Sequence, residues 1–372
     1  MKTLITDWNE PLHEPLWLGS STELRGGVIR LADDYQGGWQ QPPGQDRREP
    51  YGAVRLQPGA HDVVIDRVRF EGPPISWWEA RLQQVWTWPT RGLAIVDGRS
   101  VILHNCCFTD WIAEGIYARD FLGLQILNCE VERCNAALAL DWPRLSGNRN
   151  LVVDGLLGID MRGVDNLNAI GESILYPGGK VGSNFVWGSG LVVARVRRVR
   201  CAGEGKGVKL THSAGLALSE IRVPNIWLGG VEGTPEGWRG PIESKQISLR
   251  RSVIGESTFG QSRSKLSDPA AVVVSGVTVD ECQFEDVVML APRPGPLYAP
   301  WFPGGGPSPN FSRFQALSAQ RGFRLRLGSG CRFIDLHGDH PEPTWIIADT
   351  GASVIEDPSV PRERYTPHWE AP

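Results

Sequence analysis

The chain has 372 residues, a net charge of −4 and 22% charged residues, with 44 glycines and 28 prolines. This composition favours many turns over long helices, and basic residues that are scattered along the chain predict no nucleic-acid partner. No stretch approaches the roughly 18 uncharged apolar residues of a membrane span, and the start lacks the basic and apolar regions of a secretory signal. We therefore expect no membrane partner and a location in the cytoplasm or in a virion.

A short β-branched run, a polar pair and then a small or thiol residue recur along the chain. The clearest copies are VVIDRVRF at 63–70, VILHNCCF at 101–108, LQILNCEV at 124–131, LALSEIRV at 216–223 and VTVDECQF at 277–284. A repeat every 20 to 50 residues or so is typical of a solenoid, because one unit cannot bury its own apolar face and must stack on the next. We therefore predict one elongated domain rather than two domains with separate cores.

A second short strand, usually opening with Gly or Ala, lies between these copies. Alternating residues followed by glycine or proline predict a strand and a turn rather than a helix. Three short strands per coil then give a three-faced tube. The predicted second strands lie at 52–57, 92–98, 115–121, 136–142, 166–171, 207–213, 287–292 and 345–351.

The coils have unequal lengths, and we expect the excess to leave the tube as loops, where binding usually resides. Such insertions are predicted at 73–91, 171–190, 233–245, 255–269 and 293–321, and the last is expected to lack regular structure. Trp77, Trp78, Trp86 and Trp88 crowd into the first insertion, where their rings either pad the loops or present flat faces to sugar rings. Residues 1–17 are predicted to form an N-terminal arm or cap, and residues 358–372 an irregular tail.

Four cysteines occupy the same position of the repeat, so we expect them to stack as a ladder of reduced, buried thiols. A zinc site is disfavoured because the paired ligand spacing is missing. The four are Cys106, Cys129, Cys282 and Cys331.

The repeat pattern over about residues 18–357 resembles the right-handed parallel β-helix superfamily, the pectate-lyase-like fold. This resemblance implies an all-β solenoid with long loop insertions beside one face, in which the second strand faces a substrate groove. The Asn-x-Asp and Gly-His-Gly motifs of the polygalacturonase branch do not occur in the chain, and the arginine signature of the pectate lyase branch could not be located. The resemblance therefore transfers no catalytic residue.

Alternation along the second strands predicts two outward rows, one with Tyr117, Asn168 and Lys209, and the next with Arg119 and Asp141, while Asp97, Asp120 and His212 stand at strand ends. Stacked coils lie about 4.8 Å apart, which would bring the three aspartates within roughly 5 to 10 Å of one another. Two carboxylates at that range can divide the acid and base roles of glycoside hydrolysis. The same cluster could instead bind Ca²⁺, and with Arg119 and Lys209 nearby it would suit β-elimination from a uronate.

We therefore hypothesise a carbohydrate-active β-helix that binds an extended, acidic or neutral polysaccharide and cleaves or modifies it as a hydrolase or lyase. Catalysis is assigned to Asp97, Asp120, Asp141 and Arg119, and substrate contact to Tyr117, Asn168, Lys209, His212 and the four tryptophans of the first insertion. An aspartate at a strand end often caps a turn instead, and a lone histidine there is often structural.

Two alternatives stay open. One is a non-enzymatic bacteriophage tail or virion component that binds a receptor, which an end-on homotrimer would favour. The other is an intracellular β-helix enzyme that acts on a small molecule.

Overall fold

The computed structural model describes residues 3–35, 52–74, 91–111, 113–134, 136–159, 161, 184–201, 206–223, 226–229, 240–241 and 244–254, and the strand backbone between 272 and 354. Every regular element in these ranges is a β-strand, and every printed strand pairing is parallel, so the predicted parallel β-helix is confirmed. The chain divides into two compact units, residues 1–187 with 201–205 and residues 188–200 with 206–372. In the described part of the chain, no helix is long and apolar enough to cross a membrane.

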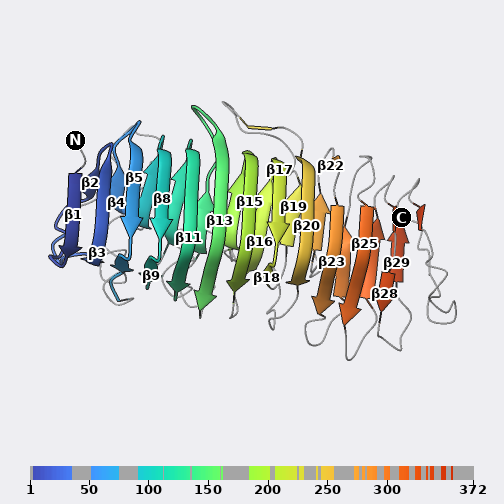
Figure 1. Ribbon diagram of the computed structural model, residues 1–372. Coiled ribbons are helices and arrows are strands. Elements are labelled where there is room, and N and C mark those ends of the chain that lie inside the picture. The colour runs from blue at the N-terminus through green and yellow to red at the C-terminus, as the bar shows by residue number, and fades with distance from the viewer. Residues whose placement is uncertain are drawn as a thin grey trace, which may run out of the picture. The chain divides into compact units, whose positions relative to one another are not determined.

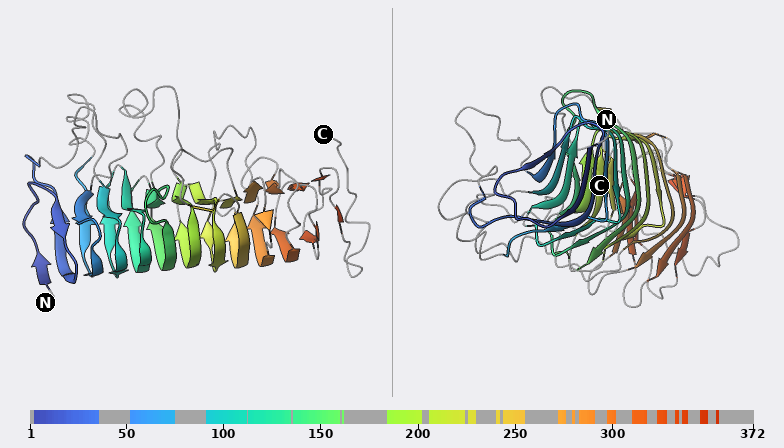
Figure 2. Two further views of the ribbon diagram at one scale, coloured as in Figure 1. Left: turned by 90° about the horizontal axis from the view of Figure 1, so that it is seen from above. Right: turned by 60° about the vertical axis from the view of Figure 1, so that its left-hand side comes forward.

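Unit 1 is built from two parallel sheets (Figure 1), and Figure 2 shows them as separate layers. The repeat copies form one sheet, here called the repeat sheet, and the predicted second strands form the other, the second sheet. The repeat sheet holds β1 (Thr3–Trp8), β3 (Thr22–Arg30), β5 (His61–Asp66), β6 (Arg69–Glu71), β8 (Arg99–His104), β9 (Cys107–Thr109), β11 (Leu122–Glu132) and β13 (Asn148–Ile159). The second sheet holds β2 (Leu16–Leu18), β4 (Gly52–Leu56), β7 (Arg91–Val96), β10 (Glu114–Arg119), β12 (Ala136–Leu140) and the start of β14 (Asn184–Ser189).

Unit 2 repeats this arrangement. Its strands of the repeat sheet are β15 (Leu191–Cys201), β17 (Ala214–Ser219), β18 (Arg222–Val223), β20 (Ser244–Ile254), β22 (Val279–Asp280), β23 (Gln283–Leu290), β25 (Asn310–Leu317), β27 (Arg332–Phe333), β28 (Leu336–Gly338) and β30 (Ser353–Val354). Its strands of the second sheet are β16 (Lys206–Thr211), β19 (Ile226–Gly229), β21 (Val272–Ser275), β24 (Leu297–Trp301), β26 (Phe323–Leu327) and β29 (Trp345–Ala348).

Three element predictions were wrong. The segment predicted as a second strand at 287–292 belongs to β23 of the repeat sheet, where Val287 pairs with Ser252. The insertion predicted at 171–190 contains β14, and the insertion predicted at 293–321 contains β24 and β25. The first error arises because a short apolar run predicts a strand without saying which sheet it joins, and the other two arise because these strands lie in segments that were assigned to loops. The strand predicted at 166–171 and the tail from 358 lie outside the described residues.

The core of unit 1 consists of side chains that stack in register from coil to coil. Leu93, Ile116 and Leu138 pair across β7, β10 and β12, and all three are fully buried. Phe70 and Phe108 stack with ring centroids 4.4 Å apart. Stacking identical positions lets each coil bury the apolar face that it could not bury alone.

The predicted thiol ladder is confirmed for its two described members. Cys106 and Cys129 are free cysteines, 1% and 2% exposed, on neighbouring coils. Cys282 and Cys331 lie outside the described residues.

The polar pair of the repeat marks a corner of each coil. Arg67, Asn105 and Asn128 have φ values of 55°, 53° and 49°, and Gly155 follows with 80°. A left-handed residue turns the chain sharply, and Asn, Asp and Gly adopt this conformation more readily than other residues. Residue types at the corners are therefore selected by the backbone, whatever chemistry their side chains offer.

Candidate functional site

The outward row of the second sheet in unit 1 has the predicted register. Trp17, Arg55, Ala94, Tyr117 and Ala139 pair in sequence across β2, β4, β7, β10 and β12. Ala94, Tyr117 and Ala139 are, however, only 2%, 3% and 0% exposed. The middle of this row is therefore closed to solvent, which differs from the open groove that the resemblance implied.

Four polar side chains gather around Tyr117, and we call them the Tyr117 cluster: Arg91, Glu114, Tyr117 and Asp141. Tyr117 Oη donates a hydrogen bond to Asp141 Oδ2 at 2.5 Å. The Arg91 guanidinium lies over the Tyr117 ring, 4.5 Å from its centroid, and Arg91 Nε donates to Glu114 Oε2 at 2.6 Å. Neighbouring strands thus supply two carboxylates, a phenol and a cation to one place.

The proton positions in this cluster follow from burial and charge. Burial, and then the charge of Asp141, raise the pKa of Tyr117 well above its ordinary value. Burial alone would lower the pKa of Arg91, but Glu114 and then Tyr117 raise it above its ordinary value. The phenol is therefore neutral and acts as a donor, while Arg91 stays charged.

Asp120 and Arg119, both predicted to be catalytic, are buried at 1% and 6% exposure. The Asp120 carboxylate accepts hydrogen bonds at 2.7 to 3.2 Å from the backbone N–H groups of four consecutive residues, 144 to 147. Arg119 Nε lies 3.6 Å from Asp120 Oδ2. Asp120 thus holds the loop that follows β12, which is the turn-capping role that the sequence left open for it.

Asp97 stands at the same corner as Asp120, one coil away, with φ values of 53° and 54°. Asp141 lies one position earlier in the register, opposite Arg119, because its backbone N–H donates to Ala118 O. In the part of the chain that the structure describes, no three His, Cys, Asp or Glu side chains gather to hold a metal ion. The expected Ca²⁺ site at the three aspartates therefore does not form as a cluster.

The remaining predicted contacts lie in unit 2 or outside the described residues. Lys209 is on β16, where burial lowers its pKa below the ordinary value. His212 is 5% exposed and has a φ of 47°, so it occupies a corner of its coil. Asn168, Trp77, Trp78, Trp86 and Trp88 are outside the described residues.

The sequence prediction missed three members of this site. Arg91 and Glu114 each precede the glycine that opens a second strand, so their opposite charges at equivalent positions of the repeat were the available signal. Trp142 follows Asp141 directly and is 37% exposed, which makes it one of the exposed large apolar side chains of unit 1. Trp17 is another, at 47%, with the Arg55 guanidinium 5.4 Å from its ring.

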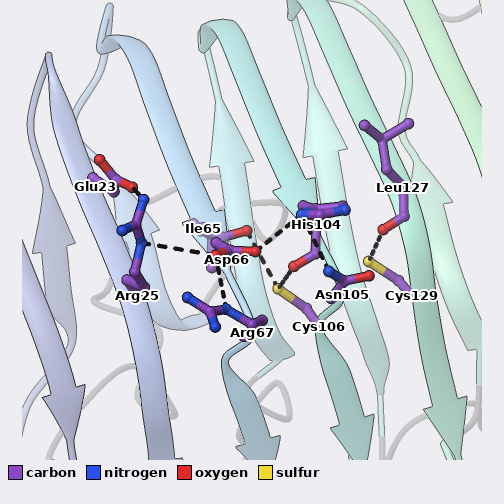
Figure 3. A network of polar contacts seen from close by, with 10 residues as sticks. All are labelled: Glu23, Arg25, Ile65, Asp66, Arg67, His104, Asn105, Cys106, Leu127 and Cys129. Carbon is purple, nitrogen blue, oxygen red and sulfur yellow. Dashed lines mark hydrogen bonds and ion pairs between the residues drawn. The ribbon is translucent and has the colours of Figure 1, made fainter.

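A second polar network lies on the repeat sheet of unit 1 (Figure 3). Asp66 Oδ2 accepts a hydrogen bond from Arg67 Nε at 3.0 Å, and His104 Nδ1 lies 3.0 Å from Asp66 Oδ1. Arg25 Nε lies 3.7 Å from the same carboxylate and also pairs with Glu23. Although burial opposes the change, the hydrogen bonds from Arg67 and His104 lower the pKa of Asp66. This network joins the strands β3, β5 and β8 across the sheet.

No known protein family matches the sequence, and no curated protein matches it either. Among solved structures, the surface adhesin PfbA of Streptococcus pneumoniae shows 8% identity and a TM-score of 0.41, over 99% of this chain and 82% of that one. The catalytic domain of a GH87 α-1,3-glucanase with bound nigerose shows 12% identity and a TM-score of 0.42, over 88% of this chain and 64% of that one. The tailspike protein of E. coli bacteriophage HK620 with bound hexasaccharide shows 10% identity and a TM-score of 0.42, over 95% of this chain and 64% of that one.

The chain thus spans slightly less than two thirds of the glucanase and tailspike chains. Likenesses at this level assign neither an activity nor a ligand to this protein.

Proposed function

We propose that unit 1 binds a glycan beside the ends of β10 and β12 and cleaves it, with Asp141 as the reacting carboxylate. The observation that carries this proposal is the hydrogen bond from Tyr117 to the partly exposed Asp141, which the exposed Trp142 follows directly in the chain. An exposed indole offers an apolar platform for a sugar ring, and a carboxylate in the same segment can take a proton from water or attack the sugar.

Each member of the Tyr117 cluster has a separate role in this proposal. Tyr117 orients Asp141, because its phenol donates a hydrogen bond to Asp141 Oδ2. Glu114 positions Arg91 by accepting a hydrogen bond from Arg91 Nε, and we assign it no role as the general acid because it is engaged in this pair. Tyr117 keeps its proton, because burial and the charge of Asp141 raise its pKa well above the ordinary value, and it therefore serves as the hydrogen-bond donor to Asp141.

Hydrolysis is favoured over elimination by the pairing of the cations. Elimination from a uronate needs a cation that neutralises the sugar carboxylate. Arg91 already pairs with Glu114, and Arg119 lies against Asp120. A neutral glycan therefore suits this cluster better than a polyuronate does.

The experiment is a panel of neutral glucans, galactans and polygalacturonate, assayed both for new reducing ends and for the ultraviolet absorbance of an unsaturated uronate. We expect reducing ends without that absorbance from a neutral glycan. Asp141→Asn should lower turnover by roughly 10²-fold or more, as for the loss of an acid–base group. Trp142→Ala should weaken binding more than it lowers kcat.

Asp62→Asn is the matched control, because Asp62 is exposed, belongs to the same unit and sits at a left-handed corner that asparagine tolerates. Equal activities of Asp141→Asn and Asp62→Asn would contradict the assignment of Asp141.

A second candidate function is glycan or receptor binding without turnover, as in a virion component. It is favoured by the burial of Ala94, Tyr117 and Ala139, which leaves the exposed Trp17 and Trp142 as contact points. Saturable binding of a glycan with no product at any enzyme concentration would select this function. Trimerisation of the chain would be a separate observation in its favour.

A further inference from the structure

The end of β12 departs from the regular hydrogen-bond ladder of the second sheet at Asp141. One coil earlier, the N–H of Asp97 donates directly to Arg119 O at 3.1 Å and so completes the ladder between β7 and β10. Because Arg119 lies opposite Asp141, the corresponding bond between β10 and β12 would join Asp120 N–H to Asp141 O.

The side chain of Asn148 stands in the place of this bond. Its Oδ1 accepts from Asp120 N–H at 2.7 Å, and its Nδ2 donates to Asp141 O at 2.7 Å. Asn148 is fully buried, and a carboxamide is a rigid group with an acceptor and a donor on different atoms. It therefore satisfies both backbone groups while it holds them apart. At the equivalent strand end of unit 2, by contrast, Gly190 N–H donates directly to Thr211 O at 3.1 Å.

Asn148 thereby fixes the direction of the Asp141 side chain. The N–H of Asp141 donates to Ala118 O at 2.9 Å and its C=O accepts from Asn148, so both of its backbone polar groups are held. In the register Tyr117 lies opposite Ala139, and its hydroxyl meets the Asp141 carboxylate diagonally. This diagonal contact depends on where the backbone of Asp141 is held.

The rest of the loop that follows β12 is held by a different residue. The N–H groups of residues 144 to 147 donate to the Asp120 carboxylate, not to Asn148. A loss of the Asn148 side chain should therefore change the direction of Asp141 more than it changes the loop. We accordingly expect Asn148 to affect the rate of reaction more than the affinity for a glycan.

We propose that Asn148 is a positioning residue for the reaction at Asp141, because its carboxamide holds the ends of β10 and β12 apart and so directs the Asp141 carboxylate. This inference rests on the proposed cleavage of a glycan at Asp141. Asn148 acts through the carbonyl of Asp141, since its own side chain is fully buried.

The first test compares Asn148→Ala with the matched control Ser252→Ala. Ser252 in unit 2 is 1% exposed and also bridges two backbone groups, because its Oγ accepts from Ile221 N–H at 3.1 Å and donates to Arg250 O at 2.8 Å. The urea midpoints of both variants should fall. Only Asn148→Ala should lower kcat, by about 10-fold or more, with a glycan Kd within a few-fold of the original. Equal kcat values in the two variants would overturn the proposal.

Asn148→Ser separates the spacing of the strand ends from their hydrogen bonding, and it serves if Asn148→Ala does not fold. A hydroxyl can accept and donate at one atom, as Ser252 does, but it is too small to hold the strand ends as far apart as a carboxamide. Asn148→Ser should therefore be more stable than Asn148→Ala and still lose kcat. Full kcat in Asn148→Ser would overturn the proposal.

A second readout does not depend on turnover. Tyrosine that is isotope-labelled at Cζ reports by NMR whether Tyr117 donates to Asp141, with Tyr117→Phe to assign the signal and Asp141→Ala to mark its position without the acceptor. Both Asn148 variants should move the signal toward that position, and Ser252→Ala should not. An unmoved signal would overturn the inference whatever the activity. A moved signal in a protein that cleaves no glycan would support the positioning of Asp141 and contradict only the proposed cleavage.

Discussion

Replacing Asp120 tests whether its carboxylate stabilises the fold or performs chemistry. In the structure this carboxylate is the shared acceptor for the backbone N–H groups of Arg144, Leu145, Ser146 and Gly147. Asp120→Ala leaves these four donors without it, and a buried donor that loses its acceptor costs about 1 to 3 kcal/mol. Three of the four bonds are only partly buried, so water can replace part of the loss, and we expect a total of about 3 to 5 kcal/mol.

Asp120→Asn is the informative companion. Asparagine tolerates the φ of 54° and keeps one oxygen acceptor, so it should cost about 1 to 2 kcal/mol. The free energy of unfolding is measured by urea titration, and hydrogen exchange of the amides at 144 to 147 should accelerate in both variants. If Asp120→Asn kept full stability and slow exchange but lost glycan turnover, the carboxylate would be chemical and the structural assignment would be wrong.

Three further perturbations test the rest of the fold. Because folding lowers the pKa of Asp66, the pairing of Asp66 stabilises the protein above the ordinary carboxyl pKa, and this stabilisation is lost as pH falls through the lowered value. The difference in the free energy of unfolding between the unsubstituted protein and Asp66→Asn should be constant near neutral pH and shrink below about pH 4. A difference that stayed unchanged below about pH 4 would contradict the pairing. In the native protein a thiol reagent should label the partly exposed Cys107 before the buried Cys106, as judged by mass spectrometry, and equal labelling would contradict the buried ladder. Gly27→Ala should lower the free energy of unfolding by about 3 kcal/mol, because the added Cβ would lie 2.2 Å from Trp8 O at a φ of +83°. Gly123 has a similar φ of +78°, but an added Cβ there would meet no atom closer than 3.7 Å. Gly123→Ala should therefore cost about 1 kcal/mol in the same urea assay.

The fold could be predicted because its signal is local and repeated. Each repeat copy carries the alternation of one strand and the polar pair of one corner, so stacking them in register recovers both sheets. Strands such as β24, which lies in a segment rich in proline and glycine, carry no such pattern. The sequence therefore did not reveal them.

The site was predicted only in part, for two physical reasons. Tyr117 and Asp141 were both named, but Tyr117 pairs in register with Ala139, so its hydrogen bond to Asp141 is a diagonal contact between neighbouring coils that depends on side-chain conformation, which residue types do not encode. Asp97, Asp120 and His212 were selected because they are titratable, although a left-handed corner also selects aspartate and histidine.

The central claim is that Asp141 reacts with a glycan while Tyr117 orients it. The most direct measurement is the kcat and the glycan Kd of Asp141→Asn beside those of the unsubstituted protein, on a neutral glycan from the panel that it cleaves. We predict a Kd within a few-fold of the original and a kcat lower by roughly 10²-fold or more. An unchanged kcat, or a loss that lies entirely in Kd, would contradict the claim.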